Sequence, residues 1–140
     1  GLGIPAEPLF RSDPLTVEAL DLSDIIFLMI KLDTGGIALA KKAIKVFKDL
    51  GYSDEKVLFV GGYHNASNAI SKDFIQENLG REIKIILPYD PSVYAKSIAS
   101  RKPLVAMSPK NKSSMIYRKM AENLLKHAIS VRERIVETEI

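Results

Sequence analysis

The sequence predicts an α/β protein with a three-layer α/β/α arrangement around a parallel sheet. Residues 25–30 form an almost unbroken apolar run, typical of a strand that is covered on both faces, so we expect this strand to lie inside the sheet. A second apolar run, residues 57–60, stops at Gly61 and Gly62. The spacing between the runs fits a helical crossover, which joins parallel strands with right-handed geometry.

The segment between these two runs has the signals of an amphipathic helix. Asp33 can cap its first free N–H groups, and Gly51 is placed to end it in a left-handed conformation. Its apolar residues recur at helical spacing, and four lysines occupy the other side. The stretch therefore predicts a strand–helix–strand unit with one helix face in the core.

Two further helices and a third strand are predicted around this unit. Asp13 indicates the start of a short helix before the first strand, and Ser71 caps a helix that ends at Gly80. Residues 83–87 form the third strand. Its Lys84 indicates either that the strand lies nearer an edge of the sheet or that the lysine side chain reaches past the core.

The last third of the chain is expected to be mostly helical. A cap at Asp90 begins one helix, and residues 100–113 are expected to be a loop with a brief extended contact at residues 104–105. From Ser114 onward apolar residues recur every three or four positions, over a helix of about twenty residues or roughly 30 Å. Charges alternate over residues 127–140, so we expect this tail to project from the domain.

Length and composition fit one α/β domain over residues 1–140. The net charge is only +3 and the lysines are spread over several predicted helices, which argues against nucleic acid as a partner. Cysteine is absent, which excludes disulfides and thiolate metal sites. No apolar run approaches the roughly 18 to 20 residues of a transmembrane helix, so a cytoplasmic protein is expected. Residues 1–13 lack periodicity, and this organisation suggests that the sequence begins partway through a larger fold.

Three loops follow the carboxyl ends of the predicted strands, where ligands usually bind in a parallel sheet. They are residues 33–36, 61–67 and 88–90, and they carry Tyr63, His64, Asn65, Tyr89 and Asp90. The alternative is that these are ordinary turns, with glycine and proline serving backbone geometry and the polar residues serving as caps. The pattern alone leaves both interpretations open.

Several catalytic chemistries are not supported by motifs. The chain has no G-x-x-x-x-G-K-S/T loop, and Asp33 would repel an anion at the helix start beside it. His64 and His127 fall on different predicted elements, which argues against a metal pair. A G-x-S-x-G elbow is also absent. No catalytic residue and no metal ligand is therefore assigned.

The order of motifs resembles the MinD/ParA-type ATPases, which carry a deviant Walker loop on a P-loop NTPase fold. The resemblance covers about residues 14–126. The similar segments are 14–28 (after Walker B and switch II), 39–52 (the helix ending in Gly-Tyr), 87–90 (the i-P-x-D loop), 100–105 (n-r-G-k-P-l-v) and 108–113 (a-P-k-s-p). The Gly51-Tyr52 joint and the ending are most similar to the CpaE/TadZ pilus-assembly branch.

The resemblance implies that this chain is the C-terminal half of such a protein. The family's Walker A lysines, Mg²⁺ ligands and switch aspartate lie upstream, so ATP and Mg²⁺ would bind only the full-length protein and this chain alone would not catalyse hydrolysis. Gly61 and Gly62 stand where the family commonly has Asn-Arg, whose asparagine recognises adenine. The candidate nucleotide-binding residues are Gly61, Gly62, Tyr63, Pro88, Tyr89 and Asp90, with Tyr89 placed to stack on a base.

The implied partners are a second copy of the protein, as a homodimer, and a membrane-associated pilus or secretion machine reached from the cytoplasmic face. One alternative is a stand-alone α/β interaction domain without nucleotide chemistry, which uses the second half of its last helix to associate. Another is the remnant of a DNA-partition ATPase, which would bind non-specific DNA in a salt-sensitive way.

Overall fold

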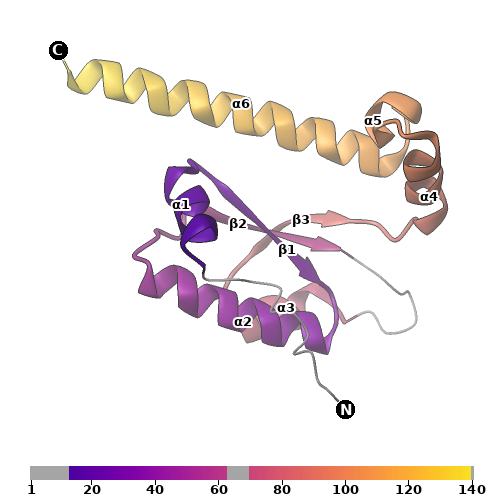
Figure 1. Ribbon diagram of the computed structural model, residues 1–140, viewed down its shortest axis with the longest axis horizontal. Helices are drawn as coiled ribbons and strands as arrows, with labels where there is room; N and C mark the ends of the chain where they lie inside the picture. The colour runs from indigo at the N-terminus through magenta and orange to yellow at the C-terminus, as the bar shows by residue number, and fades with distance from the viewer. Residues whose placement is uncertain (1–12, 63–69, 140) are drawn as a thin grey trace. The chain divides into compact units, whose positions relative to one another are not determined.

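The computed structural model describes residues 13–62 and 70–139 in two compact units, the first ending at Tyr89 and the second beginning at Asp90 (Figure 1). The first unit holds α1 (Pro14–Leu22), β1 (Ile26–Lys31), α2 (Thr34–Asp49), β2 (Val57–Gly62), α3 (Lys72–Leu79) and β3 (Ile83–Leu87). The second unit holds α4 (Pro91–Ser100), α5 (Leu104–Met107) and α6 (Lys112–Thr138).

The first unit is built on a parallel sheet of three strands in the order β1-β2-β3. The predicted α/β class with a parallel sheet is confirmed. Lys84 is exposed on β3, next to a register shift at Phe59 and Val60, as expected for a strand at the sheet edge. β2 runs through Gly61 and Gly62, which pair with β3, so the prediction that the glycines end this strand is wrong.

The expectation that residues 25–30 lie inside the sheet is also wrong for the sheet that the described residues form. β1 pairs with β2 alone and stands at the edge. An apolar run indicates that the faces of a strand are covered, but it carries no information on how many strands flank it. β1 thus combines the composition of an interior strand with an edge that no described strand occupies.

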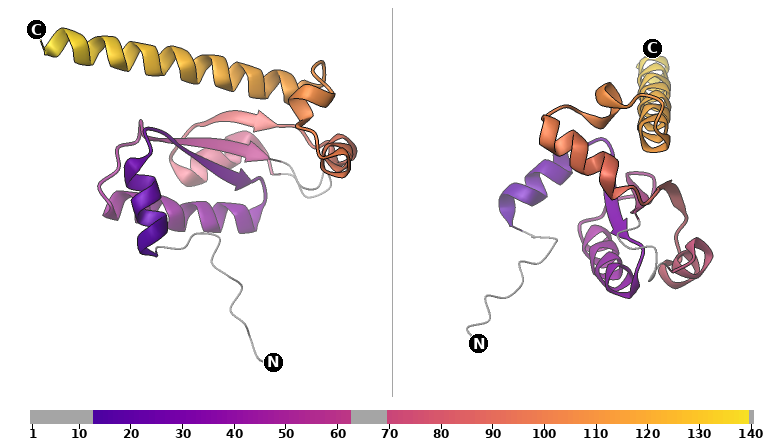
Figure 2. Two further views of the ribbon diagram at one scale, coloured as in Figure 1. Left: turned by 45° about the horizontal axis from the view of Figure 1, so that its top comes forward. Right: turned by 90° about the vertical axis from the view of Figure 1, so that its right-hand side faces the viewer.

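Helices α2 and α3 lie side by side on one face of this sheet (Figure 2). Between them and the strands is the core, which contains Ile30, Ile37, Phe47, Phe59, Ile75 and Ile83. Asp33 caps α2 as predicted, through a 2.8 Å bond from the Gly36 N–H, and Gly51 follows the helix at φ 78°. The residues beside the helix therefore set both ends of α2, through a side-chain cap at its start and a left-handed glycine after its end.

Helix α1 is joined to the segment between α2 and β2 by polar contacts. The Tyr52 hydroxyl donates to the Asp21 carboxylate, and Lys56 Nζ donates to the Asp21 carbonyl at 3.2 Å. Lys56 Nζ also lies 4.3 Å from the centre of the Tyr52 ring. Desolvation and the bond to Asp21 raise the pKa of Tyr52 to about 12, so its hydroxyl stays a donor at neutral pH.

The second unit corrects two predictions. Residues 104–107 form the short helix α5, in which the N–H groups of Ala106 and Met107 donate to the Pro103 carbonyl at 3.0 Å. Ser114 Oγ donates to the Leu104 carbonyl at 3.3 Å. Helix α6 begins at Lys112 rather than Ser114 and runs for 27 residues, roughly 40 Å, because Asn111 caps it.

Candidate functional site

The register of the sheet brings the carboxyl ends of its three strands together. Lys31 of β1 pairs with Gly62 of β2, which pairs with Leu87 of β3. Asp33, the two glycines and the Pro88-Tyr89 pair therefore belong to one edge of the sheet, as the sequence predicts. This edge is where ligands of open parallel sheets usually bind.

Leu32 organises this edge from within the core. It is only 2 % exposed, its N–H donates to the Gly62 carbonyl at 3.0 Å, and its own carbonyl accepts from the Ile70 N–H at 3.3 Å. Gly62 and Ile70 are the described residues on either side of segment 63–69, so the two flanks of that segment are fixed on one residue. The predicted site residue Tyr63, and with it His64 and Asn65, lies outside the described residues.

The two glycines at the end of β2 differ in what a side chain would meet. A Cβ at Gly61 would lie 2.8 Å from Leu32 Cδ2 and 3.2 Å from Leu32 Cγ, so Gly61 is needed for Leu32 to pack. A Cβ at Gly62 would have nothing within 4 Å among the described residues. Packing thus explains Gly61, whereas Gly62 leaves open backbone at the strand end, where a ligand can approach closely.

Gly61→Ala and Gly62→Ala should therefore separate packing from site function. We expect Gly61→Ala to destabilise the fold by about 1–3 kcal/mol, because the buried Leu32 must move, and Gly62→Ala to leave stability within about 0.5 kcal/mol. Urea unfolding followed by circular dichroism measures both. Equal losses for the two variants would contradict the assignment of Gly61 to packing.

Pro88 and Tyr89 continue directly from β3 at the same edge. Pro88 is half-buried, and Tyr89 is 46 % exposed. An exposed aromatic ring next to a half-buried proline can stack on a planar group such as a nucleotide base. This position is consistent with the stacking role that the resemblance implies for Tyr89.

Asp90 opens the second unit and is engaged there as a helix cap. Its Oδ1 accepts from the Val93 N–H at 3.4 Å and from Ser92 Oγ at 3.1 Å, while its Oδ2 accepts from Asn111 Nδ2 at 3.1 Å. The Asn111 bond is the main cause that lowers the pKa of Asp90. Asp90 is therefore a carboxylate at neutral pH, with its oxygens used to join the starts of α4 and α6.

Asn111 is the partner that sequence reasoning missed. Its Oδ1 accepts from the Ser113 N–H at 2.8 Å and caps α6, while its Nδ2 is the donor to Asp90. The signal was available, since asparagine is among the preferred N-cap residues and the next residues continue the helical pattern. Its pairing with Asp90, across 21 positions, could not be inferred from spacing.

The other chemistries considered for the sequence find no support in the described residues. Asp33 accepts from Gly36 and lies 3.0 Å from Lys31 Nζ, which favours its interpretation as a helix cap over an anion site. Across residues 13–62 and 70–139 no three His, Asp or Glu side chains are grouped to hold a metal. His127 is exposed on α6, and His64 is not described. Within the same ranges, every helix is too short or too polar to span a bilayer.

Comparison with solved structures identifies the architecture. The chain superposes on the crystal structure of a ParA family ATPase from Chlorobium tepidum TLS with a TM-score of 0.67 and 19 % sequence identity. The fold is MinD/ParA-like. No protein-family model matches the sequence, and no curated protein is significantly similar to it.

The match covers 76 % of this chain but 44 % of the ParA family ATPase, so the chain spans less than half the length of that neighbour. The MinD/ParA-like fold confirms the coarse part of the resemblance seen in the sequence. The carboxyl edge of β1, β2 and β3 therefore belongs to the parallel sheet of this fold, at the edge where ligands of such sheets usually bind.

Proposed function

We propose that this chain is the C-terminal portion of a MinD/ParA-like protein whose complete form binds ATP with Mg²⁺. The observation that carries the proposal is the edge of β1, which no strand of the described residues occupies although β1 has the apolar composition of a sheet interior. Such an edge calls for a further strand, since exposed apolar edges invite uncontrolled pairing. The coverage of only 44 % of the ParA family ATPase supports the same conclusion.

In the complete protein, the edge formed by this chain would border the base and ribose, while the phosphate-binding loop and the Mg²⁺ ligands would come from the missing part. Gly62 offers open backbone, and Tyr89 offers an exposed ring. In the sequence, Gly61 and Tyr63 adjoin Gly62, and Pro88 precedes Tyr89. Asp90 would hold the i-P-x-D loop in place through its cap bonds rather than by contact with nucleotide.

The cellular role that fits best is that of a CpaE/TadZ-type factor for pilus assembly or localisation. The Gly51-Tyr52 joint and residues 108–113 carry this branch-level resemblance. The protein would act as a homodimer in the cytoplasm and reach the inner face of the membrane through a pilus or secretion machine. Nucleic acid is not expected as a partner, because the net charge is only +3 and the lysines are spread over several helices.

A second candidate function is a stand-alone interaction domain without nucleotide chemistry. The observation that favours it is the apolar surface of α6, where Leu125, Ile129 and Val136 are half exposed or more. Under this alternative the carboxyl edge of the sheet consists of ordinary turns.

Calorimetric titration with ATP and ADP in the presence of Mg²⁺ tests the proposal. We expect no detectable binding to this chain alone, and saturable binding to the protein encoded by the complete reading frame, because the phosphates need a Gly-rich, lysine-bearing loop. In that complete protein, Tyr89→Ala should weaken binding about 5- to 50-fold through loss of base stacking. A complete reading frame without a strand that leads into such a loop would rule the proposal out and favour the interaction domain.

A further inference from the structure

Within the second unit, helix α6 is held at its start. Ser113 and Ser114 are buried, and the hydroxyl of Tyr117 lies 3.4 Å from that of Tyr94 on α4. Figures 1 and 2 show α4 and α5 gathered at the first turns of α6, while the rest of the helix runs on as a straight rod. From residue 121 to residue 139 every side chain whose exposure is described is exposed. We call residues 121–139 the α6 tail.

The α6 tail carries an apolar seam. Ala121, Leu124, Ala128 and Ile135 are separated by three, four and seven positions, which places them on the a and d positions of a heptad repeat. Leu124 is 37 % and Ile135 52 % exposed. Most of the stability of a helix in a protein comes from packing its amphipathic face, so an apolar seam indicates a surface that packs against a partner. The two alanines let a second helix approach closely.

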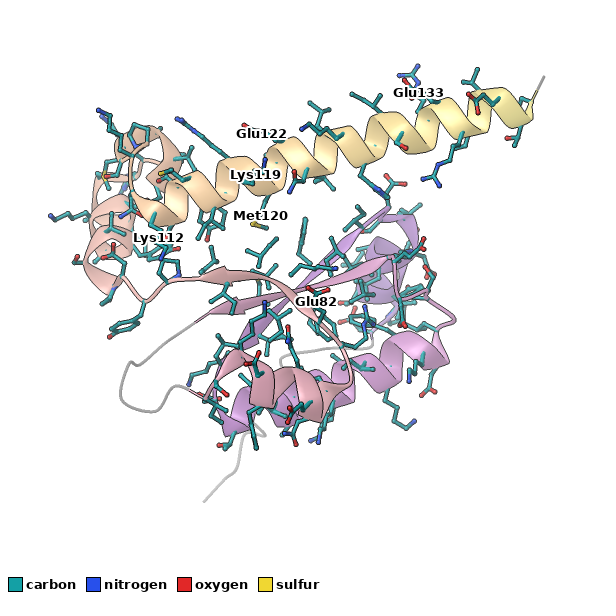
Figure 3. The ribbon with its side chains drawn as sticks, turned by 180° about the vertical axis from the view of Figure 1, so that it is seen from behind. Glu82, Lys112, Lys119, Met120, Glu122 and Glu133 are labelled. Carbon is teal, nitrogen blue, oxygen red and sulfur yellow. The ribbon has the colours of Figure 1, made fainter. Side chains whose placement is uncertain are left out.

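Polar residues occupy the side away from the seam. Figure 3 shows Glu122 and Glu133 projecting from one side of α6 and Met120 from the opposite side. The tail contains three basic and four acidic side chains, a net charge of −1. This balance disfavours an anionic membrane or nucleic acid, both of which select basic faces. The partner that matches the α6 tail is therefore another helix that carries charges of both signs.

The positions beside the seam point to a second copy of the same helix. In a parallel coiled coil, the residue just before each a position of the seam (heptad position g) faces the residue five positions further along the partner helix (position e). Arg134 then meets Glu139 of the other copy, and the symmetry of the pair makes this contact twice. Met120 likewise meets Leu125, which extends the apolar contact. The flanking pair His127 and Arg132 adds no attraction.

We propose that the α6 tails of two copies of this chain associate as a parallel two-stranded coiled coil, with Leu124 and Ile135 in its seam. This association does not need nucleotide. It is therefore separable from the nucleotide-dependent activity of the proposed function and can be tested on this chain.

Sedimentation analysis of the chain without nucleotide tests the association. We expect the wild-type chain to be a dimer at tens of micromolar, and Leu124→Gln/Ile135→Gln to raise the dissociation constant by about a hundredfold or more. The matched control is Ile129→Gln/Val136→Gln. It makes the same change on residues with exposures of 50 % and 53 %, about a third of a turn from the seam, and should retain the dimer.

A charge exchange tests the parallel arrangement. Arg134→Glu and Glu139→Lys should each weaken self-association, because each places like charges opposite one another twice, and mixing the two variants should restore it as a heterodimer. A wild-type chain that is monomeric at about 100 µM, equal losses for the seam and control pairs, or no heterodimer from the mixture would each overturn the proposal.

Discussion

Gly36→Ala is expected to cost the first unit about 3 kcal/mol or more, enough to unfold a marginally stable domain. A Cβ at this position would lie 1.8 Å from the Lys31 carbonyl oxygen and 2.7 Å from the Lys31 carbonyl carbon. Both atoms belong to the backbone at the end of β1, so the clash can be relieved only by moving α2 away from the sheet. The free energy of unfolding from urea titration measures the loss.

The neighbouring glycine supplies the control for this prediction. A Cβ at Gly35 would have Asp33 Oδ1 at 3.6 Å as its nearest neighbour, an ordinary contact, and alanine is a better helix former than glycine. Gly35→Ala should therefore be neutral or more stable by up to about 1 kcal/mol. If both variants unfold at the wild-type urea concentration, the close approach of α2 to the end of β1 is incorrect.

Sequence reasoning located the helix ends of the first unit because these depend on chemistry within a few residues. Asp13, Asp33 and Ser71 each accept an N–H bond from a residue three positions ahead, as predicted. Gly51 follows its helix at positive φ, again as predicted, and Gly80, which was predicted to end α3, has a positive φ as well. A cap needs only one side chain and one turn of backbone, so the local sequence contains all the required information.

Features that depend on distant residues were predicted less well. The composition of residues 25–30 is the same whether a strand has one neighbour or two, so the edge position of β1 could not be deduced. The sequence pattern predicts that the strand stops at Gly61 and Gly62, whereas both glycines pair with β3. It predicts an extended contact after Pro103 rather than α5, because a four-residue helix has too few residues to show a period.

In the candidate site, too, some features follow from the sequence pattern and others depend on contacts between distant residues. That three strand ends meet at one edge follows from parallel pairing, and the register confirms it for Lys31, Gly62 and Leu87. Whether a glycine there serves packing or a ligand depends on distances, and the contact of Gly61 with Leu32 could not be deduced from residues 29 positions apart. Pattern therefore locates the edge, while the particular role of each residue requires coordinates.

Replacing Asn111 with aspartate should lower the stability of the second unit at neutral pH, and this loss of stability should shrink in acid. Asn111→Asp keeps an oxygen to cap the Ser113 N–H but replaces the donor to Asp90 Oδ2 with a second carboxylate. Two adjacent like charges disfavour each other's ionised form, so the pair's pKa in the folded protein should rise above its unfolded value. We expect a melting temperature below that of the wild type at neutral pH, measured by the loss of helical circular dichroism.

The pH dependence identifies the cause of this loss. In the wild type the pKa of Asp90 is lowered on folding, so its contribution is present above the ordinary carboxyl pKa of about 4 and is lost as the pH falls through the folded value. In Asn111→Asp the repulsion is present above the raised pKa and disappears as the pH falls through it, so the deficit relative to wild type should shrink in acid. The control Asn111→Ser retains a capping oxygen without a charge. Its loss of melting temperature relative to wild type should be smaller at neutral pH, and it should not shrink in acid through the removal of charge repulsion. Equal melting temperatures for wild type and Asn111→Asp at neutral pH would show that the Asp90–Asn111 bond does not hold the starts of α4 and α6 together.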